Sequence, residues 1–149
     1  MTDERMTGDR VTGERFVPWD RPSPLLSAIG GFMRHATDPL RAGFTVDAPK
    51  TNARGLLHGG VIAAVGDVAV GYALAVRSDP PAGLVTVNLS CDLLGTAREG
   101  EWVEVLVTPT RAGRRLAAGT ATFTSTRVIA QVTALFMPSV PVPAAGAPA

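Results

Sequence analysis

The sequence predicts a single α+β domain in which one long apolar helix covers an antiparallel β-sheet. The 149 residues are enough to enclose one hydrophobic core. Residues 61–76 are apolar except for Gly66, Asp67 and Gly71, and four segments with strand-like patterns follow them. Consecutive strands usually pair antiparallel, and a sheet with one apolar face needs a cover, which only the long helix can supply.

The two ends of the chain differ in composition from the centre. Residues 1–21 contain three short, similar units rich in Thr, Gly and charge, with almost no apolar period to bury. We expect a flexible N-terminal arm, since repeats this short cannot build a solenoid. Residues 139–149 are mostly Pro and Ala without charge, so we expect a disordered tail. The folded domain is therefore expected over residues 22–138.

The first part of the domain contains weaker signals. The stretch Leu25–Met33 has apolar residues at helical spacing and predicts a short helix, despite Gly30 and Gly31. The stretch Leu40–Asp47 predicts a strand, and Pro49–Gly55 predicts a connection.

The long apolar stretch Val61–Val76 is better explained by a helix than by strands. Its 16 residues exceed an ordinary strand, no turn pair breaks it, and alanine is abundant. A membrane span is not expected, because a carboxylate such as Asp67 near the bilayer centre costs on the order of 3 kcal/mol.

The second half of the chain changes to a two-residue period. Apolar and polar residues alternate over Val85–Leu93, which predicts a strand with Val85 and the following alternate residues on a covered face. Further strands are predicted at Trp102–Val107, Leu116–Thr126 and Val128–Met137, with a hairpin turn at Arg111–Arg115.

Charge and composition exclude several classes of partner. The chain has 14 basic and 13 acidic residues, so there is no general electrostatic case for binding nucleic acid or an anionic membrane. Charged residues make up 18% of the chain, below the roughly 25% of a typical soluble protein, which suggests a surface covered in an oligomer. The lone Cys91 cannot form an intrachain disulfide, and the first residues lack the apolar core of a signal peptide. We expect a cytoplasmic protein.

Known catalytic and cofactor motifs are absent from the sequence. There is no dinucleotide-binding glycine pattern, no Walker loop and no Gly-x-Ser-x-Gly elbow. The only histidines, His35 and His58, cannot complete a zinc site with Cys91 at any accepted spacing. We therefore expect neither a metal nor a cofactor.

One segment carries a pattern suited to chemistry. Residues 52–60, Asn-Ala-Arg-Gly-Leu-Leu-His-Gly-Gly, lead directly into the long helix. The first turn of a helix offers free amide hydrogens, and glycines let a ligand oxygen approach them, so the segment predicts an oxyanion site. Within the helix, Asp67 is an acid among apolar residues, where it must be paired, hydrogen-bonded or facing a cavity.

The spacing of Gly59 and Asp67 points to an assembly. They are eight residues apart, which corresponds to roughly 12 Å along one helix. One small reacting group cannot touch both. If both act on one carbonyl carbon, the second must come from another copy of the chain, at a two-fold interface.

These residues resemble a known family. The arrangement of Asn52, then His58-Gly59-Gly60, then Asp67 nine positions after the histidine is similar to that of hotdog-fold acyl-CoA thioesterases of the PaaI type, within the 4-hydroxybenzoyl-CoA thioesterase superfamily. The likeness continues through residues 85–89 and 97–101 and covers about residues 40–137. It implies a hotdog fold, an antiparallel sheet wrapped around a long central helix.

The resemblance also implies roles for individual residues. Asp67 would act as nucleophile or as general base toward water, and the Gly59 N–H would polarise the thioester carbonyl. Asn52 would support that carbonyl or the loop before the helix, and His58 would fix the same loop. Thr86 would position water. Plain structural alternatives exist, because Asn52 suits a turn and Thr86 suits any strand.

Further residues are candidates for binding substrate. A CoA group carries several phosphate charges that guanidinium groups bind well, although a solvated turn is the favoured explanation for any single arginine. An acyl pocket edged by an aromatic residue is also possible, although helix packing explains that residue as well. The candidates are Gly60, Arg54, Tyr72, Arg111, Arg114 and Arg115. One departure from the family is that residues 93–97 lack the proline usual before the alanine, so the resemblance does not fix the local loop or the placement of substrate there.

The function implied by the resemblance is hydrolysis of an acyl-CoA thioester to a free acid and CoA, in a homodimer or a dimer of dimers (homotetramer). The alternative is a noncatalytic protein that binds acyl-CoA or a small aromatic ligand in the same groove. A hotdog dehydratase is disfavoured, because it would need His58 in a more central role. Acyl chain length, aromatic preference and the choice between direct attack and base catalysis by Asp67 stay open.

Overall fold

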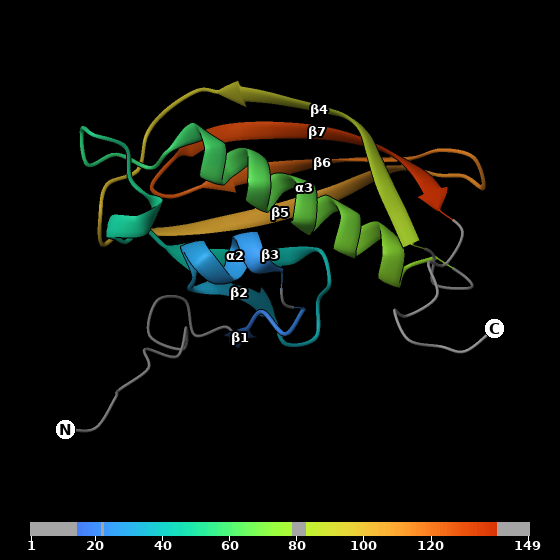
Figure 1. Cartoon of the computed structure of the whole chain (residues 1–149), viewed down its shortest axis with the longest axis horizontal. Helices are drawn as coiled ribbons and strands as arrows, with labels where there is room; N and C mark the ends of the chain where they lie inside the picture. The colour runs from blue at the N-terminus through green and yellow to red at the C-terminus, as the bar shows by residue number, and fades with distance from the viewer. Residues whose placement is uncertain (1–14, 22, 79–82, 140–149) are drawn as a thin grey trace.

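The computed structural model describes residues 15–21, 23–78 and 83–139. Within them, seven strands form one antiparallel sheet in the order β1-β2-β3-β5-β6-β7-β4, accompanied by one long helix and two short ones (Figure 1). The strands are β1 (Phe16–Pro18), β2 (Phe32–His35), β3 (Arg41–Thr45), β4 (Gly83–Leu93), β5 (Trp102–Ala112), β6 (Ala117–Thr124) and β7 (Val128–Ser139). The predicted α+β class is confirmed.

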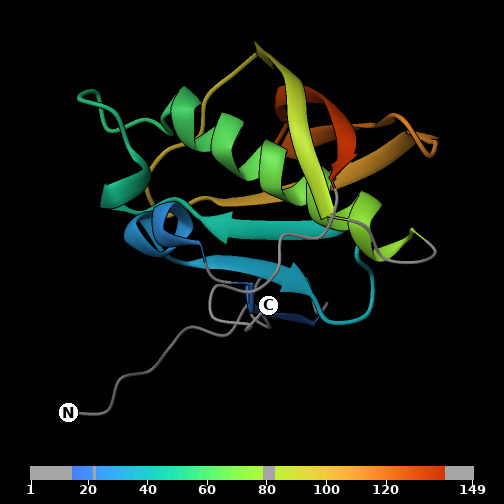
Figure 2. The ribbon, with the colours of Figure 1, turned by 45° about the vertical axis from the view of Figure 1, so that its right-hand side comes forward.

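The long helix α3 (Gly59–Val76) lies in the concave face of the sheet, which curves around it (Figure 2). It contacts β4, β5, β6 and β7, and eight of its 18 residues are buried. Packing is close, because a Cβ added at Gly66 would lie 2.8 Å from the methyl groups of Val132. By length and composition α3 could cross a membrane. Its packing against four strands makes it the core helix of this domain instead.

The short helix before β2 ends earlier than predicted. Helix α2 covers Pro24–Ile29, with Ser23 as its N-cap and a proline in its first turn. Gly30 and Gly31 have φ angles of 72° and 68°, in the left-handed region that stops a helix. The predicted extension to Met33 is therefore wrong. The chain reverses at the two glycines and enters β2.

The folded part also begins earlier than predicted. We expected an arm up to residue 21, but Phe16–Pro18 forms β1, which pairs antiparallel with β2. Phe16 is buried, and the Trp19 N–H donates to the Phe32 carbonyl at 3.0 Å. The arm was misassigned because these contacts join segments that are not adjacent in sequence. Residues 1–14 and 140–149 lie outside the described residues.

Strand β4 is an edge strand with a bulge. Thr86 and Asn88 face successive partners on β7, Phe136 and Leu135, so Val87 is an extra residue between them. The bulge reverses the alternation of side chains. The prediction that Val85 and its alternates share a covered face is therefore wrong for Val85 and Val87, which are 54% and 47% exposed, whereas Leu89 and Cys91 beyond the bulge pack against the core.

The last three strands and the tight hairpin between β5 and β6 match the sequence prediction, with β5 longer than expected. A tight turn joins β5 to β6, and in this turn the Gly113 N–H donates to the Leu116 carbonyl. Their inward side chains, together with β3 and α3, form the core, and its most buried members include Phe44, Val103, Val105, Phe123, Ile129 and Val132.

Candidate functional site

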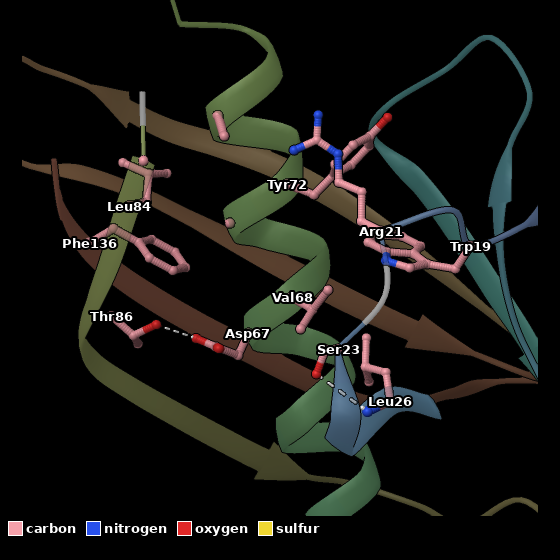
Figure 3. Close-up of a pocket in the computed structure, with 13 residues that line it drawn as sticks. Trp19, Arg21, Ser23, Leu26, Asp67, Val68, Tyr72, Leu84, Thr86 and Phe136 are labelled. Atoms are coloured by element: carbon pink, nitrogen blue, oxygen red, sulfur yellow. Dashed lines mark hydrogen bonds between the residues drawn. The ribbon is translucent and has the colours of Figure 1, made fainter. Parts of the chain in front are cut away.

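The acid within α3 is paired with a hydroxyl on β4. The Thr86 Oγ1 donates a hydrogen bond to Asp67 Oδ1 at 2.6 Å (Figure 3). The sequence placed Thr86 on the polar side of its strand. Because of the bulge at Val87, it lies instead on the inward side shared with Leu84 before the bulge and Leu89 after it, both of which pack against the core. A partly exposed carboxylate is thus held toward the strand and open on one side.

A cavity of about 310 Å³ lies over this carboxylate. Its floor is one face of α3, including Asp67, Val68 and Tyr72, and one wall comes from β4 and β7 (Figure 3). The opposite wall comes from the segment around Trp19 and Arg21. The size falls within the range of small-molecule sites, and the lining is mostly apolar with a few polar groups, as such sites usually are.

The first turn of α3 leaves one backbone N–H group without a hydrogen-bond acceptor among the described residues. His58 is the N-cap, and its Nδ1 accepts from the Gly60 N–H at 2.8 Å. The Val61 and Ile62 N–H groups both donate to the His58 carbonyl. Within the described part of the chain, the Gly59 N–H has no acceptor. Of the first-turn amides, it is therefore the one available to a ligand oxygen.

The loop before α3 is braced by Asn52. Its Oδ1 accepts from the N–H groups of Arg54 at 2.9 Å and Leu56 at 3.3 Å, so the side chain organises a turn. The loop is also tied to the preceding segment, because the His58 N–H donates to the Lys50 carbonyl at 2.9 Å. In this chain Asn52 and His58 both act on the loop that presents Gly59.

The structure therefore separates the predicted site residues into three groups. Asp67, Thr86 and Tyr72 meet at the cavity. Gly59 lies at the start of α3 with Asn52, Arg54, His58 and Gly60, near Leu93 at the far end of β4. The third group, Arg111, Arg114 and Arg115, is exposed at the β5–β6 hairpin, toward the end of the molecule where α3 ends (Figure 1).

Sequence reasoning missed the N-terminal wall of the cavity. Trp19 and Arg21 were assigned to a flexible arm, yet the Trp19 ring packs edge-on against Tyr72 with centroids 5.1 Å apart. The Arg21 guanidinium lies 5.1 Å from the centre of the same ring. Two aromatic residues within a short stretch, Phe16 and Trp19, were the available signal.

The remaining groups of chemical interest are the Cys91 thiol and the side chains that could ligate a metal ion. Cys91 is half-buried, and burial, with a smaller effect of Asp92, raises the pKa of its thiol. Among residues 15–21, 23–78 and 83–139, no group of three or more His, Cys, Asp or Glu side chains is arranged to hold a metal ion.

Comparison with known proteins identifies the family. Residues 54–127 match the thioesterase superfamily, and this match includes the start of α3, Asp67 and Thr86. A candidate esterase of Pseudomonas aeruginosa, PA0474, is 36% identical over 126 residues, which are 83% of this chain and 94% of that protein. The chain belongs to the thioesterase superfamily.

Solved structures share the same fold. A candidate esterase of Mycobacterium tuberculosis matches with a TM-score of 0.71 and 23% identity, over 81% of this chain and 100% of that one. The Escherichia coli PaaI protein matches at 0.62 and 17%, over 74% of each chain. A hypothetical thioesterase protein of Streptococcus pneumoniae, solved with coenzyme A, matches at 0.62 and 16%, over 74% and 82%. The hotdog fold and the PaaI-type resemblance are confirmed.

Proposed function

We propose that this protein hydrolyses acyl-CoA thioesters to a free carboxylic acid and CoA. Membership of the thioesterase superfamily supports thioester hydrolysis in general. The observation that carries the finer proposal is the Asp67 carboxylate, hydrogen-bonded to Thr86 and open to an apolar cavity large enough for an acyl group. A structural neighbour from S. pneumoniae was solved with coenzyme A, which supports CoA as the thiol part.

The chemistry needs one basic oxygen and one hydrogen-bond donor. The Asp67 carboxylate either attacks the carbonyl carbon or removes a proton from an attacking water. The Gly59 N–H stabilises the negative charge that develops on the carbonyl oxygen. The carbon–sulfur bond then breaks, and the CoA thiolate leaves and takes up a proton. If Asp67 attacks directly, the acyl group is left on Asp67 as a mixed anhydride, and a water then hydrolyses it to the free acid and restores the carboxylate. Neither a metal nor a redox cofactor is required in this scheme.

A second copy of the chain is proposed to complete each site. Strand β4 is an 11-residue sheet edge, and long edges are normally covered. Its outward apolar side chains, Val85 and Val87, and Leu93 and Leu94 at its end, are 47% to 62% exposed. Strand β4 pairs with β7 on one side only, so these large apolar side chains flank the unpaired edge of the sheet. Pairing with an identical edge would bury them.

The positions of Gly59 and Asp67 along β4 fit such a pairing. Asp67 bonds to Thr86 near one end of the strand, whereas a Cβ at Gly59 would lie 2.7 Å from Leu93 at the other end. Two β4 strands related by a two-fold axis run antiparallel, so the Leu93 end of one copy meets the Thr86 end of the other. That pairing carries Gly59 of one copy toward Asp67 of its partner. A dimer of dimers is compatible with the same interface.

The alternative function is a protein that binds acyl-CoA or a small aromatic ligand without turnover, and one experiment separates the two. The purified protein is incubated with a panel of acyl-CoAs and a thiol reagent that reports free CoA. A thioesterase releases many equivalents of CoA per protomer, whereas a binding protein saturates without release. The raised pKa of Cys91 keeps its thiol protonated to higher pH, which limits its background reaction. Oxygen-18 incorporation in a single turnover then distinguishes direct attack by Asp67 from base catalysis.

A further inference from the structure

The end of the cavity away from Asp67 carries a positive charge that lies over an aromatic ring. Arg21 lies over the Tyr72 ring, and Trp19 packs against another side of that ring (Figure 3). The segment that carries Trp19 and Arg21 is itself anchored. Asp20, between them, accepts two hydrogen bonds from Arg34 on β2, at 3.0 and 2.8 Å. Arg21 is exposed, and its guanidinium lies at the edge of the cavity over the Tyr72 ring.

The N–H groups of the Arg21 guanidinium are available to a ligand. Within the described residues its side chain makes no ion pair and no hydrogen bond, and its one recorded contact is with the face of Tyr72. The charge of Arg21 contributes to lowering the pKa of Asp20, but the hydrogen bonds of Asp20 go to Arg34, and Asp67, the carboxylate in the cavity lining, bonds to Thr86. A guanidinium presents planar donors that match a carboxylate in a two-point contact.

The lining between Asp67 and Arg21 suits an acyl chain better than the pantetheine arm of CoA. It consists mainly of Val68, Gly71, Leu84, Phe136 and the Tyr72 ring. Pantetheine contains amide groups, and burying an amide without hydrogen-bond partners costs free energy. Methylene groups carry no such cost. An acyl chain that starts at Asp67 therefore runs along this floor and ends at Arg21.

We propose that Arg21 selects acyl groups that carry a carboxylate at their far end, so that the substrate class is ω-carboxyacyl thioesters. This proposal rests on the proposed thioesterase function. Asp67 and Tyr72 are five residues apart on α3, or about 7.5 Å along the helix, which an extended chain of roughly six bonds spans. Adipyl-CoA, the mono-thioester of a dicarboxylic acid of about that length, is the natural test substrate, and hexanoyl-CoA is its neutral counterpart.

The test compares kcat/KM for adipyl-CoA and hexanoyl-CoA in the wild type, Arg21→Gln and Arg127→Gln. Arg127 is an exposed arginine in the turn between β6 and β7 and serves as a charge-matched control. The wild type and Arg127→Gln should prefer adipyl-CoA by about tenfold or more, the scale of one charge-assisted contact. In Arg21→Gln that preference should fall to nearly one. An unchanged preference in Arg21→Gln, or none in the wild type, overturns the proposal.

A second pair of substrates identifies which anion Arg21 binds. The same two acyl groups are presented on pantetheine, which lacks the phosphates of CoA. Retention of the Arg21-dependent preference on pantetheine supports recognition of the acyl carboxylate. An Arg21→Gln defect that is equal for both acyl groups on CoA and disappears on pantetheine shows a phosphate contact and overturns the proposal.

Failure of the proposed function gives a different result. If no thioester of the panel is hydrolysed, the dissociation constants of adipyl-CoA and hexanoyl-CoA are compared in the same variants. Tighter binding of adipyl-CoA that depends on Arg21 then supports the selectivity without catalysis. Equal binding by all variants rejects both proposals. Hydrolysis of both substrates at similar rates rejects the selectivity alone.

Discussion

Thr86 on the edge strand donates a 2.6 Å hydrogen bond to Asp67 in the central helix. The contact exists because an extra residue, Val87, turns Thr86 toward the helix. A hydrogen bond to a charged group contributes about 1.5–3 kcal/mol, so Thr86→Val should lower kcat by roughly tenfold or more. Thr86→Ser keeps the hydroxyl and should remain within a fewfold of the wild type. Equal rates for Thr86→Val and the wild type would show that the bond does not serve turnover.

Replacement of the acid itself should have a larger effect. Asp67→Asn keeps the size of the side chain and its place in α3, so we expect folding and assembly to be retained. The amide can neither attack nor accept a proton from water, and turnover should fall by at least about 100-fold. Circular dichroism and size-exclusion chromatography serve as the controls. A correctly assembled variant with near-normal turnover would reject the role of Asp67.

The pair formed by the buried Lys50 and Asp47 should lose more stability when Asp47 is neutralised than when Lys50 is replaced by an apolar residue. Lys50 is completely buried, and its Nζ bonds to Asp47 Oδ1 at 2.7 Å and lies 5.4 Å from the centre of the Phe32 ring. Asp47→Asn leaves a buried ammonium without its carboxylate and should lower the free energy of unfolding by about 2 kcal/mol, because Asp47 is half exposed and water offsets part of the loss. Lys50→Met should cost within about 1 kcal/mol. Urea denaturation gives both values, and the reverse order would contradict this interpretation.

The anchor of the N-terminal wall should depend on pH. The hydrogen bonds from Arg34, and its charge, lower the pKa of Asp20. A carboxyl group with a lowered folded-state pKa stabilises the folded state above its unfolded-state pKa and loses that effect as pH falls through the folded value. The wild type should therefore melt at a higher temperature than Asp20→Asn at pH 7, and the difference should shrink once the pH falls below about 4. A difference that persists unchanged at lower pH would exclude this cause.

The part of the fold that follows from the sequence is the part with regular periodicity. Residues 61–76 could be assigned to a helix because a long apolar stretch without turn residues has few alternatives, and Asp67 stood out as an acid within it. The same holds for the last strands. The glycines of residues 52–60 predicted a helix start with a free amide, and a helix-capping role was expected for His58. The sequence did not show which first-turn amide stays free once His58 caps Gly60.

The features that were missed depend on contacts between distant segments. Strand β1 exists because Phe16 and its neighbours pair with β2, and no local pattern reveals that pairing. The bulge at Val87 breaks the period from which the orientation of Thr86 was read. Trp19 and Arg21 line the cavity through their contacts with Tyr72, which lies more than 50 residues later on α3. The periodicity of a single sequence describes each segment alone and contains no information on contacts between segments that are distant in the sequence.

The most direct test of the shared site uses two inactive variants. Gly59→Pro removes the free amide hydrogen at the first position of α3, where proline is favoured, and His58 already has the extended backbone that precedes a proline. A Cβ at this position meets only the side chain of Leu93 within 4 Å. Gly59→Ala meets the same side chain but keeps the N–H, so it is the matched control and should retain more activity than Gly59→Pro.

Chains carrying Asp67→Asn and chains carrying Gly59→Pro are then co-expressed and the mixed dimers measured. If each site takes Asp67 from one copy and Gly59 from the other, every mixed dimer contains one site with both native residues. Random assembly should therefore restore about a quarter of wild-type turnover, although each variant alone is inactive. Mixed dimers that form but show no activity would contradict a site shared between two copies.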